Sequence, residues 1–422
     1  MPRPRWSLLC LCLSPLQVSF FAAHVLVAQP VTSPVDAILA TLKSDNAWTL
    51  AQQKSICEIP SPPFKEAARG AEYRRRLEAL GLRARVDAVG NVIAERPGSG
   101  KGPTIVLAGH LDTVFPEGTD VRVREDGKRM KGPGIGDDCR GLAVVLAVAR
   151  AYQRSNPAHD ARILFVGDVG EEGAGNLRGV RHLFERELRG QIDYFISVDG
   201  TGLGLVSRAV GSNRYKVTYK GPGGHSYGAF GIPNPIHALG RAIARIADVQ
   251  VAASPKTTFN VGVVEGGTSV NSIPFEASME IDMRSESAES LRSVDQAVRR
   301  ALQEALDAEN GRWTSERAAR ARLTMVIDTI GVRATGAQND SVRIVQAAFA
   351  TARALGFSPT ITASSTDSNI PISLGVPAVT IDGGGHGEGA HSLNEWYEDG
   401  PNGWLGPQWA ALLVAHLAGI GR

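Results

Sequence analysis

The feature that most constrains the fold of this chain is a series of short apolar runs, each followed at once by acidic residues or histidine. TIVLAG leads into His110, RILFVGD precedes Glu171, and YFISVD ends at Asp199. Apolar runs of this length are typical of strands that are buried on both faces of a parallel sheet. Because ligands bind at the carboxyl ends of such strands, we expect these side chains to converge in one crevice.

The order of the predicted elements divides the chain into a large part and a smaller inserted part. Strand and helix patterns alternate over residues 29–210 and again over 324–422, as in a doubly wound, mostly parallel α/β sheet. Residues 211–323 have a β-α-β-β-α order instead, which predicts a separate α+β domain inserted into the first. A length of 422 residues also favours two domains over one.

The first 28 residues are expected to be a signal peptide. Arg3 and Arg5 precede the apolar run SLLCLCLSPLQVSFFAAHVLVA, and small residues at its end predict cleavage near Ala28. A membrane anchor is the alternative, but a proline and two polar residues interrupt the run. We therefore expect an exported protein, periplasmic or secreted, that is not attached to the membrane after cleavage.

Charge and cysteine content narrow the partners. The chain has 45 Lys and Arg against 43 Asp and Glu, and two of the arginines lie in the predicted leader, so the mature protein is close to neutral. This balance argues against nucleic acid or an anionic membrane surface as the main partner. Of four cysteines only Cys57 and Cys139 lie beyond the leader, so one disulfide is formally possible, but there is no disulfide framework.

Three short stretches flanked by glycine, GHLDTV, GPGIGDD and GEEG, carry one imidazole and five carboxylates. Imidazole and carboxylate without thiolate suit a borderline divalent ion, most often zinc. Five acids are too many for one tetrahedral ion that keeps an open position, so we predict two ions that share a bridging carboxylate. The residues are His110, Asp112, Asp137, Asp138, Glu171 and Glu172.

With these motifs the chain resembles the di-zinc metallopeptidases that include carboxypeptidase G, tripeptidase T, carnosinase-type dipeptidases and the aminoacylases. The matching stretches are GHLDTV, GPGIGDD, GDVGEEGAGNLRGVRHLF, GPGGHSYG, GGTSVNSIP, DMR, TDSNIPISLGVPAVTI and GAHSLNEW, in that family's order. They span nearly all of the chain after the leader. The resemblance implies that the inserted domain is a ferredoxin-like lid and dimerisation domain, and that the protein is a homodimer.

The resemblance also implies a role for each matching residue. Asp112 would support an imidazole, and Glu171 would be the general base. The nucleophile would be a metal-bridged hydroxide. Cobalt or manganese could replace zinc, because affinity order and metal supply decide which ion is bound. The implied ligands of the two zinc ions are His110, Asp137, which bridges them, Glu172, Asp199 and His391.

Four other residues would act on the substrate or order the site. His225, often supplied by the partner subunit in this family, would stabilise the oxyanion. Asn271 and Arg284 would position the substrate, with Arg284 as a bidentate holder of a carboxylate. Asp367 would order the site from behind the ligands.

Two ligand assignments have a neighbouring competitor. Asp138 could reach a metal in place of Asp137, and both carboxylates remain open on the residues alone. His386 competes with His391, but the Glu-Trp pair that follows only His391 matches the family's pattern.

The chain departs from the family at one position. The family usually has Lys after the bridging acid, as in D-D-K-G, whereas here Cys139 and Arg140 follow. Arg140 is the candidate to replace the missing positive charge. Cys139 is either a small buried hydrophobe or a soft extra ligand.

The predicted function is an exported two-zinc exopeptidase that cleaves short peptides. Asp at position 199 and the run SSTDSNIPISLGVPAVTI favour the aminopeptidase, dipeptidase and tripeptidase branches over the carboxypeptidase branch. The alternatives are an N-acyl amino acid amidohydrolase of the same family and an inactive binding module with this fold. A serine hydrolase also matches formally, through GHSYG at 224–228, but the glycine and prolines that follow break the helix that a nucleophile elbow requires.

Overall fold

The computed structural model of the chain describes residues 1–4 and 33–421. Nearly all of the predicted signal peptide, residues 1–28, lies outside these described residues, so its prediction is unchanged. Within the described part of the chain, no helix has both the length and the apolar character needed to cross a membrane.

The larger part of the chain is built on a nine-stranded sheet with the order β1-β2-β6-β3-β7-β17-β8-β15, and β16 pairs with β8 outside this path. The four central strands β6, β3, β7 and β17 run parallel to one another. They are almost entirely buried, which explains their continuous apolar runs. The bounds are β1 (Arg83–Val86), β2 (Val92–Arg96), β3 (Thr104–His110), β6 (Arg162–Asp168), β7 (Tyr194–Val198), β8 (Leu205–Ala209), β15 (Gly336–Ala337), β16 (Ile361–Ser364) and β17 (Ala378–Ile381).

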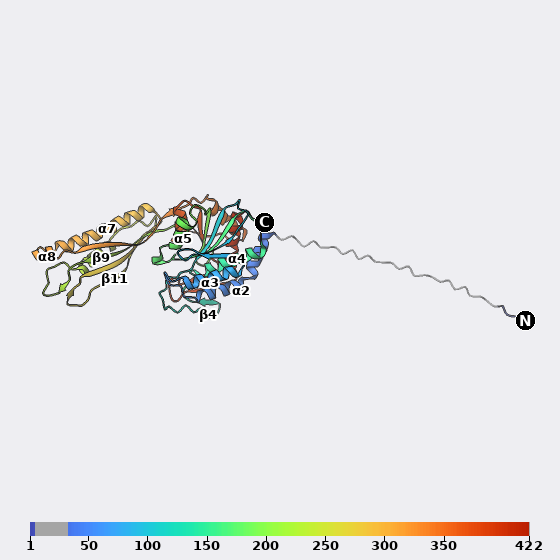
Figure 1. Cartoon of the computed structure of the whole chain (residues 1–422), viewed down its shortest axis with the longest axis horizontal. Helices are drawn as coiled ribbons and strands as arrows, with labels where there is room; N and C mark the ends of the chain where they lie inside the picture. Colours follow the sequence, from blue (N-terminus) through green and yellow to red (C-terminus); the bar gives the residue numbers. More distant parts are fainter. Residues whose placement is uncertain (5–32, 422) are drawn as a thin grey trace. The chain divides into compact units, whose positions relative to one another are not determined.

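Helices cover both faces of this sheet (Figure 1). Alternate side chains of the central strands point to opposite faces, so one set packs with α1, α2, α3, α4, α9 and α11 and the other with α5, η2 and α10. The fold class is thereby confirmed as mixed α/β with a largely parallel central sheet. The bounds are α1 (Pro34–Ser44), α2 (Asn46–Cys57), α3 (Ala67–Ala79), α4 (Cys139–Ser155), η1 (Gly173–Gly175), α5 (Arg178–His182), η2 (Leu183–Glu187), α9 (Arg343–Ala354), α10 (Asn369–Ser373) and α11 (Leu405–Leu417).

The inserted part has its own antiparallel sheet with the order β11-β13-β9-β14, and its own core under two helices. The chain order β9-α6-β11-β13-α7-β14 together with this strand order is that of a ferredoxin-like domain. The bounds are β9 (Gly211–Lys220), β10 (Gly224–His225), α6 (Pro235–Ala247), β11 (Thr257–Gly266), β12 (Ser272–Ile273), β13 (Glu276–Ser285), α7 (Ala288–Gly311), α8 (Glu316–Arg320) and β14 (Thr324–Arg333).

The last strand of this smaller sheet differs from the boundary that the sequence predicts. Residues 324–333 were expected in the second part of the large domain, but as β14 they pair along β9. An alternating strand pattern shows that one face is buried, but not which sheet the strand joins.

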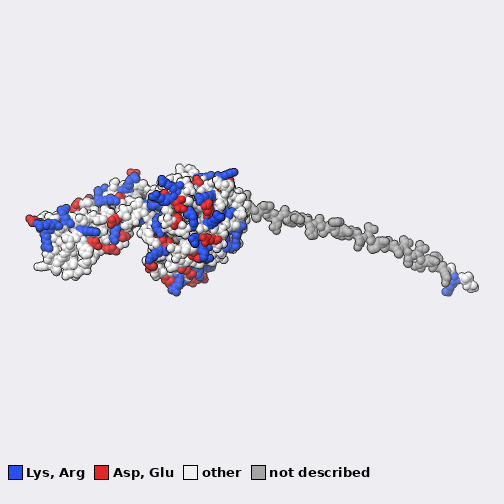
Figure 2. All heavy atoms as spheres, viewed as in Figure 1, with Lys and Arg blue, Asp and Glu red and all other residues white. Residues whose placement is uncertain are grey.

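A small four-stranded sheet, β18-β19-β5-β4, completes the described fold. Its strands are β4 (Arg124–Asp126), β5 (Arg129–Lys131), β18 (His386–Glu388) and β19 (Trp396–Glu398). On the face of the molecule shown in Figure 2, basic and acidic side chains are interspersed, with no broad area of one sign. This distribution agrees with the near-neutral charge of the chain.

Candidate metal centre

Three neighbouring strand ends form the base of the candidate site. His110 is the last residue of β3, which lies between β6 and β7 in the sheet. Glu171 and Glu172 follow β6, and Asp199 is the first residue after β7. Because these strands are parallel, their carboxyl ends lie side by side and bring the four side chains together.

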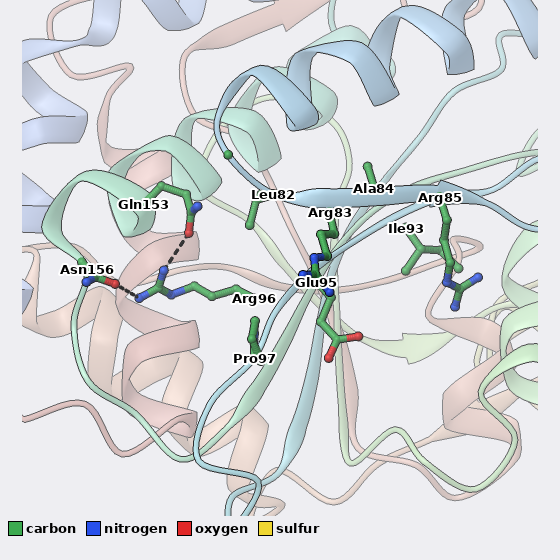
Figure 3. A pocket seen from close by; sticks show the side chains of 11 residues that line it. Leu82, Arg83, Ala84, Arg85, Ile93, Glu95, Arg96, Pro97, Gln153 and Asn156 are labelled. Carbon is green, nitrogen blue, oxygen red and sulfur yellow. Dashed lines mark hydrogen bonds between the residues drawn. The ribbon is translucent and has the colours of Figure 1, made fainter.

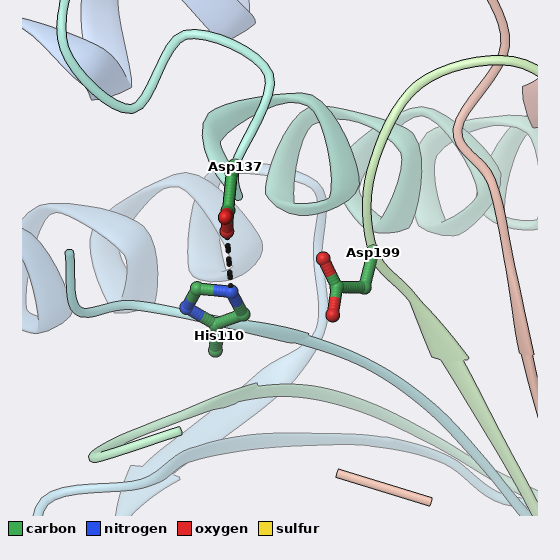
Figure 4. A group of neighbouring side chains, drawn as sticks. All are labelled: His110, Asp137 and Asp199. Atoms are coloured by element: carbon green, nitrogen blue, oxygen red, sulfur yellow. Dashed lines mark hydrogen bonds and ion pairs between the residues drawn. The ribbon is translucent and has the colours of Figure 1, made fainter. Parts of the chain in front are cut away.

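The five predicted ligands fall into groups of neighbouring side chains that could each hold a metal ion. Three groups of side chains have potential ligand atoms within 4.8 Å of one another, and they overlap. Figure 4 shows one of them, in which the carboxylates of Asp137 and Asp199 both lie near the His110 ring. The groups are His110 with Asp137 and Asp199, His110 with Glu171 and Glu172, and Asp137 with Glu172 and His391.

Asp137 has the geometry of a bridging carboxylate. Its Oδ1 lies 3.0 Å from His110 Nε2, and its Oδ2 lies 3.1 Å from His391 Nε2. Burial opposes the charged form, but hydrogen bonds from both imidazoles hold the pKa of Asp137 below its usual value. The same contacts, with Glu172 at 2.9 Å, raise the pKa of His391 to about 10. The two oxygens thus face two separate nitrogen donors.

The side chain of Asp138 has a structural role. Its side chain is completely buried and accepts hydrogen bonds from the backbone N–H of His110 and of Gly141, both at 2.9 Å. The second bond caps the N-terminus of α4. Gly141 allows this close packing, because a Cβ there would lie 2.0 Å from the Val198 carbonyl oxygen. The geometry therefore favours Asp137 over Asp138 as the bridge.

The two competing histidines lie in different surroundings. His391 contacts Asp137 and Glu172, whereas His386 is an exposed residue of β18 next to Glu388 and Trp396. Among the described residues, His386 belongs to none of the groups that could hold a metal. The geometry favours His391.

Asp112 and the predicted base form one buried arrangement. Asp112 accepts hydrogen bonds from the backbone N–H of Glu171 and of Glu172, at 3.1 and 2.9 Å. Its Oδ1 lies 3.7 Å from His110 Nδ1. Asp112 fixes the acidic loop through its carboxylate, and its backbone oxygen lies 3.1 Å from His110 Nδ1. Support of the imidazole by the carboxylate stays a prediction.

Arg333 is a site residue that the sequence analysis missed. The last residue of β14, it donates from Nη1 to Glu171 Oε1 at 2.9 Å and from Nη2 to the Glu171 backbone oxygen. Both side chains are buried, at 4% and 6% exposure. Burial raises the pKa of Glu171, and the charge of Arg333 lowers it in part. No sequence motif predicts this contact, because 162 positions separate the two residues.

Glu395 is a second residue whose role the sequence analysis did not assign. Its buried carboxylate accepts hydrogen bonds from the backbone N–H of Gly134, Gly136 and Asp137, at 2.7, 2.8 and 3.0 Å. These bonds fix the loop that presents Asp137. Burial is the main reason why the pKa of Glu395 is raised to about 7. The Glu-Trp pair after His391 could have pointed to Glu395, but the sequence analysis used this pair only to choose between two histidines.

Arg140 does not replace the missing lysine charge, which corrects that expectation. Its fully buried guanidinium donates to the carbonyl oxygens of Gly383 and Gly403, at 2.7 and 2.8 Å, and lies over the Tyr397 ring. None of these partners is a predicted ligand, so Arg140 ties loops together. Cys139 is fully buried in an apolar cluster, as a small hydrophobe would be.

The substrate residues of the smaller domain do not join the metal centre. His225 is exposed on β10, where its Nδ1 accepts hydrogen bonds from the N–H of Tyr227 and Gly228. Asn271 lies close by, and its backbone oxygen accepts a hydrogen bond from the Ser226 N–H. Arg284 donates to Asp282 at 2.6 Å. Their predicted roles remain predictions.

Asp367 lies beneath the site. It is buried near Asp168, the last residue of β6, and neither of its carboxyl oxygens has a hydrogen-bond partner among the described residues. Burial and the charge of Asp168 raise the pKa of Asp367 well above its usual value. This position agrees with a supporting role.

A cavity of about 770 Å³ lies away from the metal centre, between β1, β2 and the end of α4 (Figure 3). None of the predicted site residues lines it. Its buried cation, Arg96, is already bonded to Gln153 and Asn156, at 2.6 and 2.9 Å.

Comparison with known proteins identifies the family. The model of peptidase family M20/M25/M40 matches residues 106–402, which include all five predicted ligands. The chain belongs to this family. The predicted resemblance and the prediction of a metal-dependent hydrolase are thereby confirmed.

Relatives within the M20/M25/M40 family carry different activities in their names. A probable carboxypeptidase of Paracoccidioides brasiliensis is 27% identical over 325 residues, which cover 68% of this chain and 72% of that protein. A putative succinyl-diaminopimelate desuccinylase, DapE, of Mycobacterium tuberculosis is 28% identical over 265 residues, or 61% of this chain and 71% of that protein. Sequence similarity therefore does not separate peptidase from deacylase.

Solved structures of this family share the fold. Aminopeptidase PepT from Bacillus cereus matches with a TM-score of 0.66 at 20% identity, over 90% of this chain and 98% of that one. Human carnosine dipeptidase 1 matches with a TM-score of 0.69 at 15% identity, over 91% and 100%. The Bacillus subtilis YXEP protein, described as a dinuclear metal-binding peptidase of the M20 family, matches with a TM-score of 0.63 at 18% identity, over 90% and 100%.

Proposed function

We propose that this M20-family hydrolase is an exported two-zinc exopeptidase that cleaves short peptides and works as a homodimer. The observation that carries the two-metal part is Asp137, whose two oxygens face the imidazoles of His110 and His391. Glu172 and Asp199 complete a set of nitrogen and oxygen donors without thiolate. This donor set fits zinc, and cobalt or manganese would fit the same ligands.

The residues around the candidate centre account for the steps of hydrolysis. When bound, the two ions supply Lewis acidity to the scissile carbonyl and to the attacking water. Glu171 takes a proton from this water as its oxygen bonds to the carbonyl carbon. Glu171 then gives the proton to the amide nitrogen as the C–N bond breaks. Asp112 and Arg333 hold Glu171 in place, through its backbone N–H and its carboxylate.

Amide hydrolysis of N-acyl amino acids is the second candidate function. The relatives named as succinyl-diaminopimelate desuccinylases favour it. Both reactions break an amide bond with the same groups, so only the substrate separates them.

The homodimer is proposed from the exposure of the smaller domain. His225 contacts none of the predicted ligands within the described chain, yet the family resemblance gives it a role at the oxyanion. The edge strand β11 is largely exposed and carries apolar side chains, with Val263 at 40% and Val264 at 56% exposure. A second copy could cover this strand and supply His225.

Mixing two inactive variants tests this arrangement. His225→Ala and Glu171→Gln subunits are each expected to be inactive as homodimers. If His225 acts on the partner's centre, one site of each mixed dimer is intact, and mixing restores up to about a quarter of the activity. Activity that stays at zero in mixed dimers shown to have formed would refute action between subunits.

The proposal as a whole is tested by metal content and substrate preference. Purified protein is analysed for bound metal and for cleavage of a mixed panel of di- and tripeptides and N-acyl amino acids, before and after chelation. Two metals per chain and chelator-sensitive peptide cleavage are the expected result. Preferential cleavage of acyl substrates would select the second candidate, and metal-free, inactive protein would leave a binding module. Export is tested separately, by the first residue of the protein recovered from the medium or periplasm.

A further inference from the structure

Cys57 and Cys139 lie together in the core, although they are far apart in the sequence. Cys57 is the last residue of α2, and Cys139 is the first residue of α4. Both side chains are completely inaccessible to solvent, and they belong to one small apolar cluster with Val123, Ile135 and Tyr397. They are the only cysteines among the described residues.

Both cysteines are held by the same short loop. The thiol of Cys57 donates to the carbonyl oxygen of Pro133 at 3.5 Å. The backbone N–H of Cys139 donates to the carbonyl oxygen of the next residue, Gly134, at 3.1 Å. Burial raises the pKa of the Cys57 thiol, and the neighbouring Cys139 raises it further. The shared cluster and the shared loop place the two cysteines side by side in the core.

The surroundings do not favour a metal as the reason for this pairing. A structural zinc site needs four ligands, and the other members of the cluster are apolar side chains. Among the described residues, neither cysteine belongs to a group that could hold an ion. Two buried cysteines in one small cluster can be joined by a disulfide bond.

We propose that Cys57 and Cys139 form a disulfide bond when the protein matures in an oxidising compartment. The oxidant is another disulfide, either of a small thiol or of a thiol–disulfide oxidoreductase. One cysteine attacks that disulfide and forms a mixed disulfide, which the second cysteine then resolves. The Cys57–Cys139 bond forms, the oxidant's S–S bond breaks, and two electrons and two protons leave on its two thiols.

The bond would link two helices beside the metal centre. It would join the end of α2 to the start of α4, immediately after the loop that presents Asp137. A link that closes so long a stretch of chain stabilises mainly by restricting the unfolded state. For a protein of this size we expect the melting temperature to rise by about 2–5 °C. The proposal does not depend on the hydrolase activity; only its occurrence in the cell depends on the proposed export.

The test is a thiol count on the purified full chain after it is unfolded and refolded in mixtures of reduced and oxidised glutathione, so that both thiols are accessible while the protein folds. Samples are quenched in acid, unfolded and alkylated, and linked peptides are identified by mass. The expected result is two alkylated thiols in reducing buffer, none in oxidising buffer, and one peptide pair that joins Cys57 to Cys139. Two free thiols, or glutathione adducts alone, in the oxidising buffer would overturn the proposal.

Single serine variants provide the matched control. Cys57→Ser and Cys139→Ser should each lose the melting-temperature difference between the two buffers that the unsubstituted protein shows. An equal difference in a variant would overturn the link as its cause. If a variant fails to fold, the thiol count of the unsubstituted protein still shows whether the disulfide forms. A disulfide that forms in glutathione but is absent from protein recovered from cells would contradict export and leave the pairing supported.

Discussion

Replacement of Arg333 by methionine is expected to move the acidic limb of the kcat–pH profile to higher pH without removing the metal ligands. The Arg333 Nη1 atom lies 2.9 Å from Glu171 Oε1, and both side chains are buried. Burial already raises the pKa of Glu171, and Arg333 is the first cause that lowers it. Without this cation the carboxyl group stays protonated to higher pH and cannot accept a proton from water.

The size of the effect follows from the burial of the pair. Removing one partner of a buried ion pair costs about 3–5 kcal/mol. We take the lower value, because bound metal ions would also stabilise the charged form of Glu171. About 3 kcal/mol corresponds to about two pKa units, so at a pH on the acidic limb of the profile kcat should fall by up to roughly 100-fold. The direction of the shift follows from the loss of a positive charge: the acidic limb of the kcat–pH profile moves to higher pH, and activity recovers in alkaline buffer.

The assay is kcat as a function of pH on the best substrate of the panel, together with metal content. Arg181→Met is the matched control, because Arg181 donates to the backbone oxygen of Val332 at 3.2 Å, next to Arg333, but is not bonded to Glu171. Arg333→Lys keeps the charge and should lose less. A methionine variant whose acidic limb does not move, or whose loss of kcat is the same at every pH, would refute the reasoning.

Three further predictions concern single carboxylates. Glu171→Gln should retain bound metal and lose turnover by about a hundredfold or more, which metal analysis and kinetics would check; near-normal turnover would remove Glu171 from the mechanism. Glu395→Gln should lower the free energy of unfolding by about 1–3 kcal/mol and weaken metal retention, since three backbone N–H groups lose a charged acceptor; unchanged denaturation and metal content would contradict this. Burial raises the pKa of Asp382 to about 6, so its contribution to stability is complete below its ordinary pKa and is lost as pH rises through about 6. Asp382→Asn should therefore raise the free energy of unfolding by about 1–3 kcal/mol above that pH and not in acid. An equal gain in acid would show that the ionisation of Asp382 is not its cause.

The elements with strong local signals were predictable. Continuous apolar runs identified the buried strands β3, β6 and β7, and the rule that parallel strands present ligands at their carboxyl ends placed His110, Glu172 and Asp199 in one region. Motif order then identified the family, which the match over residues 106–402 confirmed. The boundary at residue 323 was misplaced for a physical reason, since β14 shows the same alternation whichever sheet it joins.

The sequence by itself determined the strands, the metal-binding residue types and the family, because each of these depends on residues that are neighbours in the chain. Only the tertiary structure decided which of two adjacent carboxylates faces both imidazoles, since Asp138 is occupied by backbone donors. It also decided the contact of Arg333 with Glu171 and the placement of Cys57 and Cys139 in one buried cluster. These pairs are made by packing between elements distant in the chain, and such contacts leave no periodic pattern in a single sequence.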